Sequence, residues 1–255
     1  MKDSSDTPEN GNYDLIVLGA GSAGFSASIT AAEAGKRVAL VGHGTIGGTC
    51  VNVGCVPSKA MIRAAETVHG GGAAGRFPGV NPCAHRVNWR DLVSGTADLV
   101  TEMRQKKYSD LLPQYDGVSY FEQGPARLTE DGVVVGGRTL SANRIIIATG
   151  SRPHIPEIAG IETIDALDST GLLTLPERPD SLIVLGGGYI GAELAQMASR
   201  LGVAVTLVTR SRLLPGAEPE VAEALASAMR AEGIRIETGL SYRAVAAQDG
   251  GVALT

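Results

Sequence analysis

Two cysteines set five positions apart are the residues in this sequence best suited to chemistry. Cys50 and Cys55 lie in the run 47–59, which reads GGTCVNVGCVPSK. On a regular helix, residues five apart rise about 7.5 Å, beyond the roughly 7 Å between Cα atoms that a disulfide tolerates. A bridge therefore requires a distorted first turn, and Gly54 and Pro57 suit such a turn. Because helix N-termini stabilise thiolates, we expect a redox-active dithiol here.

The setting of the pair favours a reactive role over a structural clip. The 255 residues contain three cysteines, and the first residues, MKDSSD, are polar and do not resemble a secretory signal. These features indicate a reducing, cytoplasmic location, where structural disulfides rarely persist. The pair is then either catalytic or metal-binding. Cys83, in the run NPCA, is expected to be an ordinary thiol.

Charge and hydropathy argue against two classes of partner. The chain carries 22 basic and 27 acidic residues, for a net charge of -5, which gives no basic surface for nucleic acid. The longest apolar runs, such as RIIIA at 144–148, have the length of a strand and fall short of the roughly 20 residues of a membrane-spanning helix. We therefore expect a soluble protein whose partner is a small molecule or a metal ion.

One pattern occurs twice in the chain, and it predicts the elements that position the dithiol. Residues 15–41 and 182–208 align at a constant offset of 167, with 12 identities in 27 positions. Each copy reads as an apolar strand, a G-x-G-x-x-G turn, an alanine-rich helix and a second strand, which is a dinucleotide-binding unit. Its glycines allow the tight turn, the approach of a pyrophosphate and the packing of helix on strand. The candidate nucleotide-binding residues are Gly19, Ala20, Gly21, Ser22, Ala23 and Gly24 in the first copy and Gly186, Gly188, Tyr189, Ile190 and Gly191 in the second.

The position after the second strand of each unit discriminates between nucleotides. An acidic side chain there holds a ribose hydroxyl, whereas an arginine accommodates a 2′-phosphate. The second unit has Thr209 at this place, followed by Arg210 and Arg212. This favours NADPH, with Arg210 the better candidate for the phosphate and Arg212 the second; the alternative is a solvent-exposed charged loop. The first unit has Gly42 and then His43, with no carboxylate, which is a weakness in its ribose site.

Further elements connect the two units. The predicted elements are helices at 58–69 and about 89–112, short strands at 118–122, 126–128 and 133–135 that form a meander over the first sheet, and a buried strand at 144–148. The charged positions of the second helix are expected to form a solvated face. The tip of the buried strand should lie near the first nucleotide, because strand ends face the ligand crevice in doubly wound sheets.

The fold class that follows is α/β. We expect two Rossmann-like domains of three-layer ββα architecture, the second of them incomplete. The expected boundaries are a polar tail at 1–12, a first domain at 13–153 that carries the dithiol, and a second domain at 154–255.

Taken together, these motifs resemble those of the flavin-dependent pyridine nucleotide-disulfide oxidoreductases, over residues 13–255. The run 44–59 is typical of the cysteine-containing branch of that family. The resemblance implies FAD in the first unit, NAD(P)H in the second, Cys50 as the thiol that meets the substrate and Cys55 as the thiol against the flavin. The residues implied to assist in binding FAD are Gly44, Thr49, Lys59, Ala148, Thr149 and Gly150.

The same resemblance assigns roles to three further residues. It implies that Lys59 and Glu193 pair beside the flavin, and that the ring of Tyr189 moves aside when the nicotinamide enters. From the residues alone, other interpretations remain open. Lys59 could be a solvated helix lysine, Glu193 a helix carboxylate, and Tyr189 part of the core.

Within the branch, the run CVNVGCVPSK followed by MIRAA looks most like mercuric reductase. This resemblance implies reduction of Hg(II), held by Cys50 and Cys55, with electrons passing from NADPH through FAD; soft sulfur ligands suit such an ion. A disulfide substrate, such as lipoamide or glutathione, and a non-catalytic remnant that binds a nucleotide or metal remain alternatives. The sequence ends at Thr255, inside the second unit. The interface domain that makes family members homodimers is therefore expected to lie outside this chain.

Overall fold

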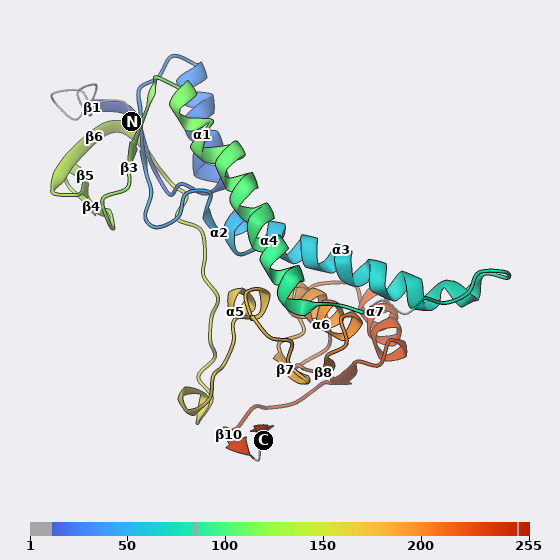
Figure 1. Ribbon diagram of the computed structural model, residues 1–255. Helices are drawn as coiled ribbons and strands as arrows, with labels where there is room; N and C mark the ends of the chain where they lie inside the picture. The colour runs from blue at the N-terminus through green and yellow to red at the C-terminus, as the bar shows by residue number, and fades with distance from the viewer. Residues whose placement is uncertain (1–11, 84–85, 249) are drawn as a thin grey trace. The chain divides into compact units, whose positions relative to one another are not determined.

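The fold is seen in a computed structural model that describes residues 12–83, 86–248 and 250–255 (Figure 1). The polar tail expected at 1–12 lies outside the described residues except for Asn12, which begins the first strand. The chain divides into two compact units. The first contains the described residues up to Val56 together with Asp98–Arg152, and the second contains Pro57–Ala97 and Pro153–Thr255.

The first unit is built on a six-stranded sheet. Its strands are β1 (Asn12–Leu18), β2 (Val38–Val41), β3 (Val118–Phe121), β4 (Arg127–Thr129), β5 (Gly132–Val135) and β6 (Arg138–Ile147), in the order β3-β2-β1-β6-β5-β4. Strands β3, β2, β1 and β6 pair in parallel, whereas β4, β5 and the first residues of β6 form an antiparallel meander. Strand β6 therefore belongs to both, pairing first with β5 and then with β1.

Alternation along the strands separates two apolar layers. Ile16 and Leu18 face the meander and pack with Val133 and Val135. Val17, one position away, faces the helix α1 (Ser22–Glu33) and packs with residues such as Phe25. Successive side chains of a strand point to opposite faces. The helix, the sheet and the meander are thus the three layers that the sequence predicts for the first unit.

The C-terminal half of β6 departs from the prediction of a buried strand. Ile145 and Ile146 are each 39% exposed, and Ile147 is 65% exposed. Within the described part of the chain, this end of the strand is therefore not fully covered on either face. The tip of the strand nevertheless lies where we expect it, since Ala148 N donates to Leu18 O at 2.7 Å, beside the first glycine turn.

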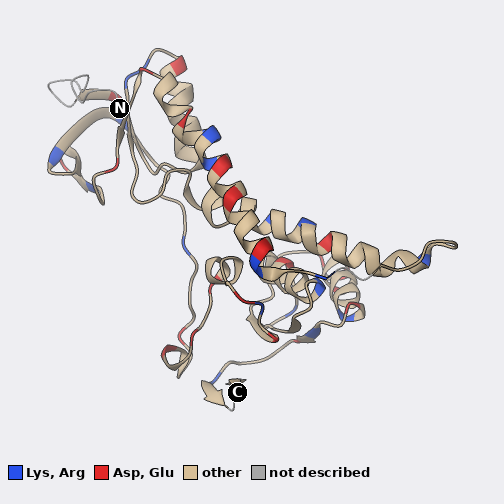
Figure 2. Ribbon diagram, viewed as in Figure 1, with Lys and Arg blue, Asp and Glu red and all other residues tan. Residues whose placement is uncertain are grey.

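The helices that follow the dithiol are longer or more irregular than expected. Helix α3 (Cys55–Gly72) leads to a 3-10 turn, η2 (Ala73–Arg76). Helix α4 (Trp89–Arg104) ends earlier than the predicted 89–112 and continues as a π-helical turn, η3 (Gln105–Ser109), and a 3-10 turn, η4 (Leu112–Gln114). Figure 2 shows acidic and basic residues interspersed along α4, which agrees with a solvated face.

The second unit repeats the strand-turn-helix pattern. Strands β7 (Ser181–Leu185), β8 (Ala204–Val208) and β9 (Arg235–Glu237) form a parallel sheet in that order. The remaining elements are η5 (Ile161–Thr163), α5 (Ser169–Leu173), α6 (Tyr189–Arg200), α7 (Pro219–Ala231), β10 (Val245–Gln248) and β11 (Gly251–Leu254). Met197, Leu207 and Met229 fill the centre of its core, together with Met61 and Ala65 of α3.

Candidate functional site

The helix breaks between the two cysteines, as their spacing predicts. Cys50 lies in the short helix α2 (Gly48–Asn52) and Cys55 begins α3. Gly54, between them, packs tightly against the first of these turns. A Cβ at Gly54 would lie 2.9 Å from Thr49 O and 3.3 Å from Cys50 Cα. This close approach, and not only backbone freedom, explains why a glycine occupies the position.

The two thiols interact with each other. Cys50 is half-buried and Cys55 is exposed. A hydrogen bond with the Cys55 thiol, followed by burial, raises the pKa of the Cys50 thiol above its ordinary value, while the positive charge of Lys107 opposes this shift. The contact with Cys55 therefore acts on the Cys50 thiol in the opposite direction to the expected effect of a helix N-terminus.

Asn52 fixes the cysteine turn and was not singled out by the sequence analysis. Its Nδ2 donates to Ile46 O and to Gly48 O, both at 2.9 Å. Its Oδ1 accepts from Arg104 Nη1 at 3.0 Å. Arg104 is thus an exception to the solvated charges of α4, because it reaches a side chain in the cysteine segment. No periodicity in the sequence marks this contact, since the two residues are 52 positions apart.

The cysteine segment packs directly on the first glycine turn. Gly47 N donates to Ala20 O at 2.9 Å, and Gly21 forms a bridge with Gly47. A Cβ at Gly48 would lie 2.6 Å from Gly21 Cα. The dithiol helix and the predicted pyrophosphate-binding turn therefore meet backbone to backbone, and this contact requires a glycine at position 48.

The first turn itself has the geometry of its motif. Gly19 has φ +114°, and a Cβ there would meet Ala148 O at 2.1 Å; a Cβ at Gly24 would meet Gly19 O at 1.8 Å. The hydroxyls of Ser22 and Tyr108 are 3.1 Å apart, so the π-helical turn η3 places Tyr108 at the start of α1. Of the other predicted FAD contacts, Gly44, Thr49, Thr149 and Gly150 are exposed, Ala20 is buried, Ala23 is exposed and Ala148 is half-buried.

Gly42 is buried, and its missing side chain leaves no void. A Cβ at Gly42 would lie 2.6 Å from Tyr120 Oη and 2.9 Å from both Tyr120 Cε2 and Ala20 Cβ. The tip of the Tyr120 ring thus occupies the space through which a side chain at position 42 would extend. His43 beside it is exposed.

The second glycine turn is more open than the first. A Cβ at Gly191 would meet Gly186 O at 2.1 Å, which repeats the helix-on-strand packing of the first unit, but a Cβ at Gly188 has nothing within 4 Å. Tyr189 and Ile190 are 65% and 64% exposed. The interpretation of Tyr189 as part of the core is therefore wrong. The backbone at the start of α6 is accessible to a ligand.

Lys59 and Glu193 meet within the second unit. Lys59 Nζ and Glu193 Oε2 are 2.5 Å apart, and their side chains are 54% and 44% exposed. Lys59 lies one helical turn beyond Cys55 on α3. The two side chains thus form an ion pair across 134 positions of sequence, and their exposure leaves both able to contact a ligand.

The two candidate arginines after β8 differ. Arg212 donates through Nη2 to Pro215 O and to Ala217 O, at 3.0 and 2.6 Å, and so holds its own loop. Among the described residues, its buried Nη1 has no hydrogen-bond partner. Arg210 is exposed, and its charge opposes the rise in the Tyr242 pKa that burial causes. Arg210 is thus the more accessible of the two side chains, and its role as the phosphate contact stays a prediction.

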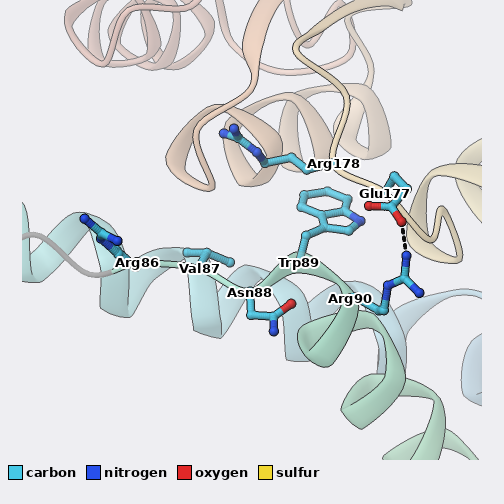
Figure 3. Close-up of a pocket in the computed structure, with 7 residues that line it drawn as sticks. All are labelled: Arg86, Val87, Asn88, Trp89, Arg90, Glu177 and Arg178. Carbon is cyan, nitrogen blue, oxygen red and sulfur yellow. Dashed lines mark hydrogen bonds and ion pairs between the residues drawn. The ribbon is translucent and has the colours of Figure 1, made fainter.

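A surface hollow elsewhere in the second unit does not contain the predicted site residues. It is lined by Arg86, Val87, Asn88, Trp89, Arg90, Glu177 and Arg178 (Figure 3). The indole of Trp89 is buried and donates to Leu175 O at 2.7 Å, and Arg90 forms an ion pair with Glu177. These contacts hold the start of α4 on the segment before β7, which is a structural role.

Two features are absent from the described residues. They hold no cluster of three or more histidine, cysteine, aspartate or glutamate side chains that could bind a metal ion. None of their helices is both long and apolar enough to cross a membrane. A metal ion at Cys50 and Cys55 would therefore be held by two sulfurs of this chain.

Comparison with known proteins gives a consistent result. The family model described as pyridine nucleotide-disulphide oxidoreductase matches residues 13–255. The mercuric reductases of Streptomyces lividans, Staphylococcus aureus and Bacillus cereus are 43%, 41% and 43% identical over 95%, 96% and 95% of this chain. The matches cover 52%, 44% and 38% of those relatives, so the chain spans about half of their length or less.

A solved structure supports the same fold. The HOCl-induced flavoprotein disulfide reductase RclA from Escherichia coli matches with a TM-score of 0.81 and 28% identity, over 95% of this chain and 53% of that one. The Cu(II) complex of the same reductase matches with a TM-score of 0.81 and 27% identity, over 94% and 52% of the two chains.

Proposed function

Because the chain belongs to the pyridine nucleotide-disulphide oxidoreductase family, we propose that it is the FAD- and NADPH-binding part of an oxidoreductase that reduces Hg(II) through Cys50 and Cys55. The observation that carries the proposal is the pair of hydrogen-bonded thiols at a helix break, packed on a glycine turn. The balanced reaction is NADPH + Hg(II) → NADP⁺ + H⁺ + Hg(0). In this assignment FAD binds in the domain 13–153 and NADPH in the domain 154–255.

The residues present suit FAD at the pyrophosphate end of the first unit. The turn at 19–24 begins α1, whose first backbone N–H groups favour an anion. Gly44 and Gly150 have positive φ, and a Cβ at either would meet nothing within 4 Å, which leaves room for a ligand near the backbone. When bound, FAD supplies the transfer of an electron pair between NADPH and the cysteines. The residues proposed to contact it are Gly19, Ala20, Gly21, Ser22, Ala23, Gly24, Gly44, Thr49, Lys59, Ala148, Thr149 and Gly150.

The two cysteines have different proposed roles. Cys50 meets the substrate and Cys55 contacts the flavin; the exposure of Cys55 supports its access to a cofactor. Two thiolates are soft ligands that suit Hg(II) much better than oxygen donors. The raised pKa of Cys50 means that this thiol must give up its proton as the metal binds. Proton release therefore accompanies substrate binding.

The second unit is proposed to bind NADPH. The open backbone at Gly188 and the exposed Tyr189 support an approach of the nicotinamide nucleotide along the start of α6. Arg210 is proposed to contact the 2′-phosphate, whereas Arg212 positions the loop. Accordingly, Arg210→Ala should raise the KM for NADPH and leave that for NADH unchanged, and no change in the NADPH/NADH ratio would contradict this assignment.

The ion pair of Lys59 and Glu193 is proposed to lie beside the flavin when the cofactor is bound. Its contribution to folding is small, because exposed pairs are worth about 0–1 kcal/mol. A functional role therefore predicts that Lys59→Met changes the flavin spectrum or its redox behaviour while the melting temperature stays nearly constant. A variant with wild-type spectrum and potential would leave the pair as a surface contact only.

The dithiol proposal can be tested on this chain directly. Cys83→Ser provides a matched control, since Cys83 is an exposed thiol outside the pair. We expect the control to bind FAD and to show, after oxidation, two thiols regained when NADPH is added under anaerobic conditions. Cys50→Ser and Cys55→Ser in the same background should bind FAD without that gain. Failure of the control to bind FAD, or to regain thiols, would contradict the proposal.

A disulfide substrate is the second candidate, and the likeness to a flavoprotein disulfide reductase favours it. NADPH oxidation driven by Hg(II), by oxidised lipoamide and by oxidised glutathione, compared in a full-length version of the protein, separates the two. We also propose that the full-length protein is a cytoplasmic homodimer. The small number of cysteines, three in 255 residues, supports a reducing compartment, and sedimentation of the full-length form tests the dimer.

A further inference from the structure

The adenosine end of the proposed FAD site lacks the side chain that such sites normally use. In a dinucleotide-binding unit, an acidic residue just after the second strand holds a ribose hydroxyl. Here the second strand β2 ends at Val41, and the next residue is Gly42. Gly42 N still donates to Phe121 O at 2.8 Å, so the backbone follows the ordinary path beside β3. Only the side chain is missing.

A hydroxyl from the neighbouring strand stands in its place. Tyr120 lies on β3, where it is the register partner of Leu40 on β2. Its Oη lies 2.6 Å from the point where the Cβ of a residue at position 42 would be, and 2.9 Å separates that point from the Cβ of Ala20 in the glycine turn. The phenol therefore lies between the end of β2 and the first nucleotide turn, at the carboxyl edge of the sheet. This edge is where ligands bind in doubly wound folds.

The chemistry of the phenol fits a ribose partner. A tyrosine hydroxyl both donates and accepts a hydrogen bond, as does a ribose hydroxyl. Partial burial and then the negative charge of Glu122 raise the pKa of Tyr120 above its ordinary value. The group is therefore a neutral donor at physiological pH. Glu122, directly after β3, is exposed.

We propose that the Tyr120 hydroxyl replaces the missing carboxylate and binds the adenosine ribose of FAD. This inference rests on the proposed function, because it assigns a residue to the same cofactor. It also explains why position 42 is a glycine, because a larger residue there would collide with the Tyr120 ring. Since no φ in the left-handed region is involved at Gly42, space alone excludes a side chain.

Cofactor affinity provides the first test. The Kd for FAD is measured by quenching of flavin fluorescence for wild type and for Tyr120→Phe. Tyr115→Phe is the matched control, because the Tyr115 hydroxyl contacts Glu33 at the surface. Loss of one neutral hydrogen bond should weaken FAD binding by Tyr120→Phe about fivefold, with no change for the control. An FAD analogue with a deoxyadenosine ribose should bind wild type less tightly than FAD does, and this preference should shrink in Tyr120→Phe.

An exchange of the two positions provides the second test. Gly42→Glu alone should weaken FAD binding, because its side chain meets the Tyr120 ring. In the Tyr120→Ala background, the same Gly42→Glu change should instead strengthen binding relative to Tyr120→Ala alone. The reversal tests whether Tyr120 occupies the space that a carboxylate at position 42 needs, whereas the comparison with Tyr120→Phe tests the hydrogen bond itself. Far-ultraviolet circular dichroism of each variant establishes that it is folded.

The outcomes separate the two proposals. If wild type binds no FAD, the proposed function fails together with this inference. If wild type binds FAD and Tyr120→Phe binds it equally well with an unchanged preference over the deoxy analogue, only the inference is overturned. Loss of affinity in Glu122→Gln without loss in Tyr120→Phe would also overturn it, by assigning the ribose to the carboxylate.

Discussion

Replacing Asn52 should loosen the cysteine turn and lower the stability of the first unit. The side chain makes three hydrogen bonds, of which two hold the backbone of residues 46–48 and one receives Arg104. Asn52→Ala removes all three. Asn52→Asp keeps the size of the side chain and its contact with Arg104 but replaces the donor with an acceptor, so that two carbonyl oxygens face a carboxylate.

The expected magnitude follows from these contacts. At about 1 kcal/mol net for each hydrogen bond, Asn52→Ala should cost about 3 kcal/mol. For a protein of this size, this corresponds to a fall in melting temperature of roughly 6–12 °C. In Asn52→Asp, the new ion pair with Arg104 contributes about 1 kcal/mol of stability at most, because the site is partly exposed. That gain is too small to offset the loss of both carbonyl contacts, so this variant should also be destabilised.

Thermal denaturation and disulfide formation in the Cys83→Ser background test the reasoning. Both Asn52 variants should melt at lower temperature, and the cysteines should close to a disulfide about tenfold more slowly, since a loosened turn holds the two thiols together less often. Arg104→Ala should show a smaller effect in the same direction, and in the Asn52→Ala background it should add little. A melting temperature within 2 °C of wild type for Asn52→Ala, or an Asn52→Asp variant as stable as wild type, would refute the assigned role.

Three further predictions concern the same turn and one partly buried ion pair. Gly54→Ala should cost about 1–3 kcal/mol, measured by denaturant unfolding, because its Cβ is too close to the preceding turn; an unchanged midpoint would contradict this. Lys107→Ala should move the pH profile of Cys50 alkylation to higher pH, since removal of the positive charge raises the thiol pKa further, and an unmoved or lowered profile would exclude that influence. Arg200→Met should cost about 1–3 kcal/mol at pH 7, because Glu232 then keeps the hydrogen bond from Gln196 but loses its charged partner, in a site where the two paired side chains are 18% and 15% exposed. Arg200 lowers the pKa of Glu232 below its ordinary value of 4.5. The stability that the pair contributes is therefore present above pH 4.5 and is lost as the pH falls through the pKa of the folded state. An Arg200→Met variant that loses stability to acid as steeply as wild type would argue against the pair.

Local patterns in the sequence were sufficient to predict the elements that carry the proposed chemistry. The two glycine turns follow from spacing alone, because a tight turn and close helix packing admit no other residue. The break between Cys50 and Cys55 follows from the geometry of a regular helix, which cannot bring residues five apart together. These are short-range constraints, and each involves neighbours in the chain.

Long-range contacts were the part that the sequence did not reveal. Arg104 looked like another solvated charge of its helix, and only the fold brings it to Asn52. The π-helical turn that follows has no signature in the sequence, yet it places Tyr108 against Ser22. The isoleucines of β6 led to a prediction of burial, because the sequence shows that they are apolar. It does not show how much of the strand other elements cover.

The contact between Gly48 and Gly21 makes the two copies of the nucleotide unit unequal. In the first copy, the helix that carries Cys50 packs against the glycine turn. The corresponding turn of the second copy, at Gly188, has no such neighbour among the described residues. The two copies of one pattern thus differ in packing, since the first glycine turn contacts the cysteine helix and the second is open. A dithiol segment moved to another nucleotide-binding unit would therefore need the glycine at position 48, because a Cβ there would lie 2.6 Å from the Cα of Gly21 and would push the cysteines away from the turn.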